Sequence, residues 1–260
     1  MKDDTVKLGL DPAGPATERP ISIAIVAMGG QGGGVLSDWI VGLAESQGWV
    51  AQATSVPGVA QRTGATIYYV EAMPASKTGQ RPILAQMPTP GDVDVVLAAE
   101  FMEAGRSILR GIVTPDRTTL IASNHRTLST IEKIAPGEGI ADSSAVVDAI
   151  GVAAKTRIAF DMNELAVRHG SVISSALFGS LAASGALPFD REAFYAVIRG
   201  SGKGVEASIR TFDAAFERAR AGEPAAEIAV AEEPPVPARL GDPRADRLLQ
   251  RLRVKIGRPG

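Results

Sequence analysis

Residues 21–66 read ISIAIVAMGGQGGGVLSDWIVGLAESQGWVAQATSVPGVAQRTGAT and set the architecture of the chain. The first seven residues, 21–27, are apolar and rich in β-branched side chains, which predicts a buried strand. A cluster of glycines follows, and apolar residues then recur at helical spacing, so we expect an amphipathic helix that ends near Gly48. A strand, a glycine turn and a helix are the opening of a doubly wound α/β domain. The start of that helix offers unpaired N–H groups to an anion.

The glycine turn does not match the usual nucleotide-binding motifs. The dinucleotide fingerprint needs glycines at positions i, i+2 and i+5; Gly30 and Gly32 fit, but Val35 occupies the third place. The second strand, expected at about 49–56, carries no carboxylate that would hold a ribose. A P-loop needs Lys and Ser or Thr after its last glycine, whereas apolar residues follow Gly34. The turn alone is therefore as consistent with a tight strand-to-helix connection as with a ligand contact.

A second polar loop is expected at 55–66, between the strand at 49–56 and a strand at 66–73. It contains turn residues, hydroxyl groups and Arg62. Loops at the carboxyl ends of neighbouring strands in a doubly wound sheet meet at one crevice, so we expect Arg62 to lie near Gln31. An arginine beside a helix start is suited to binding an anion. The alternative is an ordinary solvated surface arginine.

Two motifs in this order resemble the gamma-type domain of the 2-oxoacid:ferredoxin oxidoreductases. They are Gly-Gly-Gln-Gly after the first strand and Val-Ala-Gln-Arg-Thr-Gly-Ala at 59–65. The family more often has glycine where this chain has Thr63. The resemblance covers about residues 21–220 and includes Gly-Lys-Gly-Val-Glu at 202–206. With GGQGGG and VAQRTGAT in full, the chain is most similar to the beta subunits of the indolepyruvate members of this family.

The resemblance implies a subunit of an enzyme that converts a 2-oxoacid and coenzyme A into an acyl-CoA, carbon dioxide and reduced ferredoxin. For the indolepyruvate members it implies arylpyruvate substrates and aryl-acetyl-CoA products. It also implies that thiamine diphosphate, Mg²⁺ and 4Fe–4S clusters lie on a large alpha subunit, in a hetero-oligomer such as α2β2. This chain alone is then expected to bind no cofactor.

Candidate site residues follow from the two motifs by the same resemblance. They are Gly30, Gln31, Gly32, Gln61 and Arg62, all on the coenzyme A side of the active site. No catalytic residue is identified. Two other classes stay open: a structural subunit that only covers its partner's active site, and a stand-alone oxidoreductase that binds a nucleotide through an unusual turn.

The composition of the chain argues against several classes of protein. The net charge of −2 argues against a nucleic-acid binder that works by neutralising phosphates. No apolar run approaches 20 residues, so no membrane span is expected, and the N-terminal region lacks a signal core, which favours a cytoplasmic protein. There is no cysteine and there are two histidines. No thiolate of this sequence can therefore ligate an iron–sulfur cluster, and a metal centre is not expected.

The rest of the chain alternates before it becomes helical. Further strands are expected at 93–99, 118–123 and 157–162, and helices at 100–111, 145–155, 163–169, 172–184, 190–201 and 204–220. This order predicts a Rossmann-like, doubly wound, mostly parallel sheet with a helical C-terminal part. We expect a flexible arm at 1–20, one domain at 21–220, a proline-rich linker at 221–243 and an amphipathic helix at 244–260.

Several side chains outside the motifs have two interpretations. Glu100 is either a catalytic acid at the crevice or, as we favour, a helix acid that suits the macrodipole. His125 is either a general base or, as we favour, a solvated loop histidine. Asn163 is expected to cap the next helix, with a subunit contact as the alternative. Tyr68 and Tyr69 must point to opposite faces of their strand, so one is expected in the core and the other free for an interface.

Overall fold

A computed structural model describes residues 19–56, 66–76, 82–127, 144–202 and 204–222. Its centre is a six-stranded sheet with the strand order β2-β3-β1-β4-β5-β6. The strands are β1 (Ile21–Ala27), β2 (Trp49–Val56), β3 (Thr66–Pro74), β4 (Val95–Ala98), β5 (Thr119–Ser123) and β6 (Thr156–Phe160). The sheet was expected from the apolar runs, and the first two strands have the bounds that the sequence predicts.

Strand direction divides the sheet into two parts. β1, β4, β5 and β6 are parallel, whereas β3 is antiparallel to both of its neighbours, β1 and β2. Parallel neighbours need a crossover of about a dozen residues or more. The interval between β2 and β3, residues 57–65, is shorter than that, so these strands pair as a hairpin. The expected doubly wound, mostly parallel sheet is confirmed, with an antiparallel hairpin at one side.

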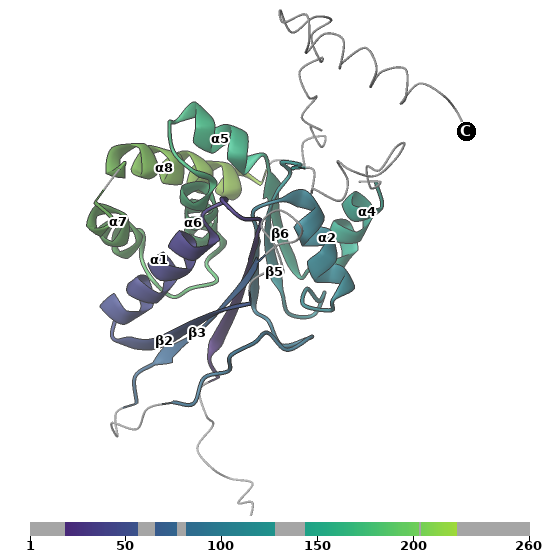
Figure 1. Ribbon diagram of the computed structural model, residues 1–260, viewed down its shortest axis with the longest axis horizontal. Helices are drawn as coiled ribbons and strands as arrows, with labels where there is room; N and C mark the ends of the chain where they lie inside the picture. Colours follow the sequence, from purple (N-terminus) through teal and green to yellow (C-terminus); the bar gives the residue numbers. More distant parts are fainter. Residues whose placement is uncertain (1–18, 57–65, 77–81, 128–143, 203, 223–260) are drawn as a thin grey trace, which may run out of the picture.

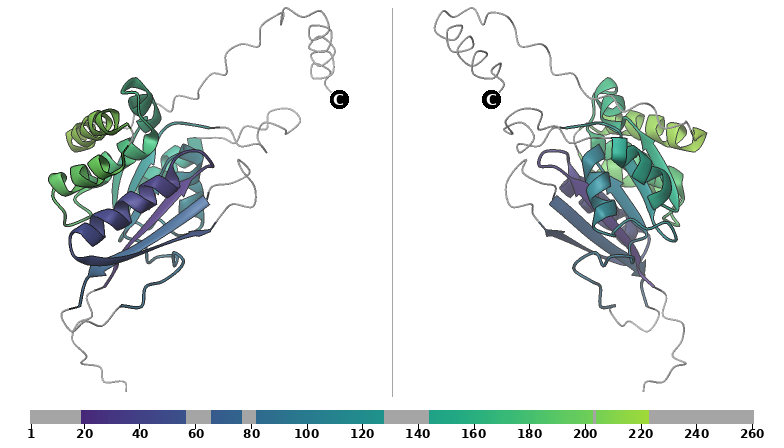
Figure 2. Two further views of the ribbon diagram at one scale, coloured as in Figure 1. Left: turned by 60° about the vertical axis from the view of Figure 1, so that its left-hand side comes forward. Right: turned by 90° about the vertical axis from the view of Figure 1, so that its right-hand side faces the viewer.

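Helices cover both faces of the sheet (Figures 1 and 2). They are α1 (Gly33–Ser46), α2 (Phe101–Leu109), α4 (Ser144–Ala153), α5 (Met162–Arg168), α6 (Ile173–Ser184), α7 (Arg191–Gly200) and α8 (Val205–Ala221). α1 and the C-terminal helices α5 to α8 lie on one face, and α2 and α4 lie on the other. The predicted helical C-terminal part is confirmed.

The face that carries α1 holds the larger core. Trp39 of α1 and three fully buried phenylalanines pack together there, with the Phe178 ring 5.3 Å from Trp39 and 4.7 Å from Phe194. α6 crosses α8 so closely that a Cβ on Gly179 would lie 2.3 Å from the carbonyl oxygen of Phe212. This packing fixes the start of α6 relative to α1, which matters for the site below.

Some expectations fail or lie outside the described residues. The helix expected at 100–111 ends at Leu109, two residues earlier, and 88 % of this leucine is exposed. The predicted arm, linker and C-terminal helix fall almost wholly within 1–18 and 223–260, outside the described residues. No helix in the described part of the chain is long and apolar enough to cross a membrane.

Candidate functional site

A tight turn connects β1 to α1 at the edge of the sheet where the parallel strands end, here called the carboxyl edge. The Gln31 N–H donates to the Met28 carbonyl (3.1 Å), and the Met28 N–H donates to Gln31 Oε1 (2.8 Å). Gly30 (φ 93°) and Gly32 (φ 72°) have left-handed backbones that other residues rarely adopt. The predicted residues Gly30, Gln31 and Gly32 are therefore brought together in one turn, hereafter the glycine turn.

The neighbouring structure also demands glycine at two positions of the turn. A Cβ on Gly32 would lie 2.9 Å from Ser174 Oγ of α6, and a Cβ on Gly33 would lie 2.5 Å from the ring of Tyr68 on β3. A Cβ on Gly34 would meet the same ring at 3.6 Å, an ordinary contact. The start of α1 is thus packed between β3 and α6 with no room for a side chain at Gly32 or Gly33.

Hydrogen-bond donors dominate this turn. The Gln31 carbonyl oxygen Oε1 is occupied by the Met28 N–H, so its Nε2 amine is left as a donor. Within the described residues, the N–H groups of Gly33 and Gly34 have no acceptor, because the first helical bond is from Leu36 to Gly32. The first turn of α1 carries no acid. Donors at a helix start without a carboxylate are suited to an anion.

The two ends of the 57–65 interval emerge at the same edge. Thr66 pairs with Ala27, the last residue of β1, and Val56 pairs with Ile67. Gln61 and Arg62 lie outside the described residues, so the expectation that Arg62 approaches Gln31 stays a prediction. Both flanks of its loop are nevertheless fixed at the edge that carries the glycine turn.

Glu100 follows β4 at the carboxyl edge but is only 1 % exposed. Its carboxylate caps α2 by accepting the N–H groups of Met102 (2.7 Å) and Glu103 (3.2 Å), and it also accepts the Thr127 N–H (3.0 Å). The guanidinium of Arg126 lies 3.8 Å away. Burial raises the pKa of Glu100, while the backbone donors and Arg126 oppose that rise. This carboxylate serves the helix, as the favoured interpretation holds, and does not open onto solvent.

His125 and Asn163 are the other two candidate side chains that the structure describes. The His125 ring is half-buried, with Nε2 3.1 Å from Thr127 Oγ1. Asn163 does not cap α5; Asp161 does, by accepting the Glu164 N–H at 2.7 Å, because β6 ends two residues earlier than expected.

The tyrosine prediction is half right. Tyr69 is buried in the core under α2, and its hydroxyl donates to Glu71 Oε1 (2.5 Å). Burial and this carboxylate raise the pKa of Tyr69. The other tyrosine, Tyr68, is not free, because its ring packs on Gly33 and Gly34 of α1. No local pattern in the sequence indicated that Tyr68 and Ser174 border the glycine turn.

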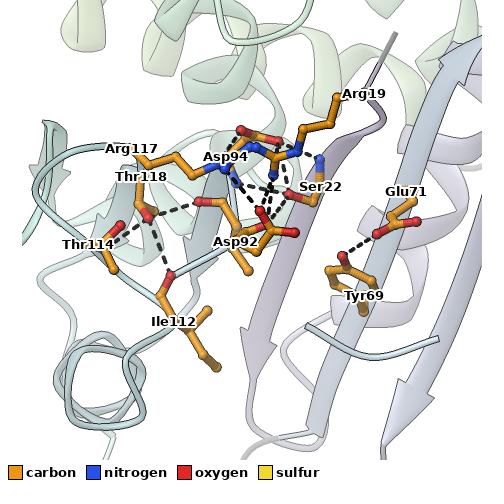
Figure 3. Close-up of polar contacts among 11 residues, drawn as sticks. Arg19, Ser22, Tyr69, Glu71, Asp92, Asp94, Ile112, Thr114, Arg117 and Thr118 are labelled. Atoms are coloured by element: carbon orange, nitrogen blue, oxygen red, sulfur yellow. Dashed lines mark hydrogen bonds and ion pairs between the residues drawn. The ribbon is translucent and has the colours of Figure 1, made fainter. Parts of the chain in front are cut away.

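A cluster at the opposite edge of the sheet pairs arginines with carboxylates (Figure 3). Asp94 accepts the N–H (2.9 Å) and hydroxyl (2.9 Å) of Ser22 and the Arg117 Nε–H (2.9 Å). Arg19 and Arg117 both pair with Asp92 as well, at 2.8 and 3.0 Å. These contacts join the start of β1 to the segment before β4, and they place carboxylates beside the arginines. Within the described residues, no group of three His, Cys, Asp or Glu side chains is arranged to hold a metal ion.

The comparison with known families decides the assignment of this chain. A family model described as pyruvate ferredoxin/flavodoxin oxidoreductase matches residues 22–218. The chain belongs to this family. The match spans the whole described fold, from the strand before the glycine turn to the last turns of α8. No curated protein matches the chain.

Solved structures of this kind share the fold at low sequence identity. A pyruvate oxidoreductase subunit from Thermotoga maritima is 16 % identical, with a TM-score of 0.52 over 77 % of this chain and 97 % of that one. The gamma subunit of a keto/oxoacid ferredoxin oxidoreductase from Geobacter sulfurreducens is 17 % identical, with a TM-score of 0.50 over 77 % and 99 %. A third structure is the 2-oxoglutarate:ferredoxin oxidoreductase from Magnetococcus marinus with 2-oxoglutarate, coenzyme A and succinyl-CoA bound. It is 15 % identical and has a TM-score of 0.52. The match covers 78 % of this chain and 32 % of that one.

Proposed function

We propose that this chain is a subunit of a 2-oxoacid:ferredoxin oxidoreductase and that its glycine turn lines the coenzyme A side of the active site. The observation that carries the proposal is the group of N–H donors at the glycine turn without an acceptor among the described residues, at the carboxyl edge where doubly wound folds bind ligands. Coenzyme A is a polyanion, and backbone N–H groups at a helix start favour its phosphates. Family membership supplies the reaction class.

The same proposal assigns the reactive groups to a partner. The described residues present no metal-ligand cluster, and the sequence contains no cysteine for an iron–sulfur cluster. A large alpha subunit would therefore hold thiamine diphosphate, Mg²⁺ and the 4Fe–4S clusters, and would pass electrons to ferredoxin. Thiamine diphosphate supplies the carbanion chemistry of 2-oxoacid decarboxylation. This chain would bind and orient the acceptor of the acyl group.

We further propose arylpyruvates, such as indolepyruvate, as the 2-oxoacids, and a hetero-oligomer such as α2β2. Both follow from the likeness of GGQGGG and VAQRTGAT to the indolepyruvate members of the family. Rates with indolepyruvate, pyruvate and 2-oxoglutarate, measured on the complex, test the substrate. A preference for pyruvate or 2-oxoglutarate would contradict it.

Arg62 and Gln61 complete the proposed coenzyme A side. Both belong to the interval that begins after Val56 and ends before Thr66, at the edge that carries the glycine turn. A guanidinium there would add a positive charge to the neutral donors of the turn.

The test replaces Arg62 with alanine in the assembled complex. The apparent KM for coenzyme A should rise about tenfold, on the scale of one charge-assisted hydrogen bond. The release of carbon dioxide in the half-reaction without coenzyme A should be nearly unchanged. Arg199→Ala is the control, because Arg199 pairs with Glu192 on α7. An unchanged coenzyme A dependence in Arg62→Ala would favour a subunit that only covers its partner.

A further inference from the structure

The starts of α1 and α6 adjoin at the carboxyl edge (Figure 1). Gly32 is the N-cap of α1, and Ser174 is the second residue of α6. The two residues lie directly against each other. Neither helix has a side chain that caps its first N–H groups, and neither has an acid in its first turn. The two helix starts therefore lie close together, and neither has a negative side chain that offsets its partial positive charge.

Ser174 gives an independent sign that something polar belongs here. It is 0 % exposed, and its Oγ has no hydrogen-bond partner among the described residues. The neighbouring hydroxyls differ: Ser171 Oγ lies 3.0 Å from Ser175 Oγ and 3.2 Å from Ser208 Oγ. A buried hydroxyl without a partner costs about 1–3 kcal/mol of folding free energy. A ligand that forms a hydrogen bond with this hydroxyl would remove that cost.

We propose that the starts of α1 and α6 form one binding site for a phosphoryl anion, with Ser174 as a donor from α6. The other donors are the N–H groups of Gly33 and Gly34 and the Nε2 amide group of Gln31. These three groups can only donate and the Ser174 hydroxyl can donate as well, which favours an anion over a cation. In the described conformation Gly32 lies against the Ser174 hydroxyl. For the Ser174 hydroxyl to reach the anion, the turn at Gly32 must move away from this hydroxyl.

This inference deepens the proposed function and rests on it for the identity of the natural ligand. The phosphoryl group could belong to the diphosphate of coenzyme A or to a free phosphate or diphosphate. The chemistry of recognition is the same for both sources. Calorimetric titration of the full chain with coenzyme A, pyrophosphate and the uncharged fragment pantetheine distinguishes them.

The decisive variant is Ser174→Ala. It removes an unsatisfied hydroxyl, so the chain should unfold at the same temperature or slightly higher. Its affinity for pyrophosphate should nevertheless fall about 3- to 10-fold, because one donor to the anion is lost. Ser180→Ala is the matched control on the same helix, since that hydroxyl donates to the Ala176 carbonyl (2.9 Å). It should leave pyrophosphate affinity unchanged.

The outcomes separate this inference from the proposed function. Pyrophosphate binding that depends on Ser174 supports the site; if coenzyme A then fails to compete, the coenzyme A assignment fails while the anion site stands. Equal pyrophosphate affinity in wild type and Ser174→Ala, or no pyrophosphate binding at all, overturns the site. The proposed function would survive that result if Arg62→Ala still raised the KM for coenzyme A.

Discussion

The helix starts in the described part of the chain differ in whether they carry negative charge. α2, α5 and α7 each begin with a carboxylate that accepts backbone N–H groups, from Glu100, Asp161 and Asp190 respectively. Each also has an acid in its first turn. α1 and α6 have neither, and α8 is intermediate, with Glu206 in its first turn but no capping side chain.

At α2, α5 and α7 the chain supplies the negative charge at the helix start, whereas at α1 and α6 it supplies none. A capped start has its anion built in and gains stability from it. The bare starts of α1 and α6 lie together at the carboxyl edge, where ligands of doubly wound folds bind. We interpret the absence of carboxylates there as the condition for binding an external anion.

The largest effect should come from breaking the most deeply buried cap. Glu100→Ala removes the acceptor for three backbone N–H groups and the carboxylate beside Arg126. The free energy of unfolding should fall by about 2–4 kcal/mol. Denaturant titration of the chain measures it. A loss below about 1 kcal/mol would show that this cap does not stabilise α2 as described.

A smaller loss is expected when a side chain is forced into the bare start of α1. Gly33→Ala brings a Cβ to 2.5 Å from the Tyr68 ring, so the free energy of unfolding should fall by about 1–3 kcal/mol. Gly34→Ala is the matched control, because its Cβ meets the same ring at 3.6 Å. It should be neutral or up to about 1 kcal/mol more stable. Equal losses in both variants would be inconsistent with the described packing.

The free energy of unfolding should depend on pH through Glu100, the buried cap of α2. Burial raises the pKa of Glu100 above its ordinary value of 4.5. As the pH rises from about 4.5 towards the raised pKa, the unfolded chain loses this proton first, so this residue's contribution to stability falls. Below and above that window the contribution is flat. Unfolding of wild type and Glu100→Gln from pH 4 to 8 tests this, and the variant should lack that part of the slope. Parallel pH profiles would contradict the raised pKa.

The smallest change in stability should come from capping a bare start. Val172, the N-cap of α6, is 58 % exposed and has an extended backbone (φ −115°, ψ 156°), which suits a capping side chain. Val172→Asp should raise the free energy of unfolding by about 0.5–1 kcal/mol. Val172→Asn should do nearly the same without adding charge. Thermal unfolding of both variants measures the gain; a loss in both would mean that α6 cannot accept a cap.

Local sequence predicted most of the fold. The strands at 21–27 and 49–56 were correctly bounded, because apolar runs and glycines mark their ends in the chain itself. The hairpin direction of β3 was not predicted, although the short interval before it favours antiparallel pairing. Asn163 was assigned the cap of Asp161 because β6 was expected to extend to residue 162. An error of two residues in the expected end of β6 thus led to the wrong capping residue for α5.

The candidate site residues came from the resemblance of the two motifs to the family. The structure places Gly30, Gln31 and Gly32 in one turn, and their role in binding coenzyme A stays a prediction. Ser174 and Tyr68 were missed, because they reach this turn through the packing of α6 and the pairing of β3, which no local pattern encodes. Gln61 and Arg62 remain predictions.

The central claim is most directly tested by adding a negative charge to the bare helix starts and measuring coenzyme A binding. Calorimetry on Val172→Asp, with Val172→Asn as the uncharged control, makes the comparison in the full chain. The account predicts that Val172→Asp binds coenzyme A at least about tenfold more weakly than wild type, although it is more stable, whereas Val172→Asn binds as wild type does. Equal affinity in all three proteins would contradict it.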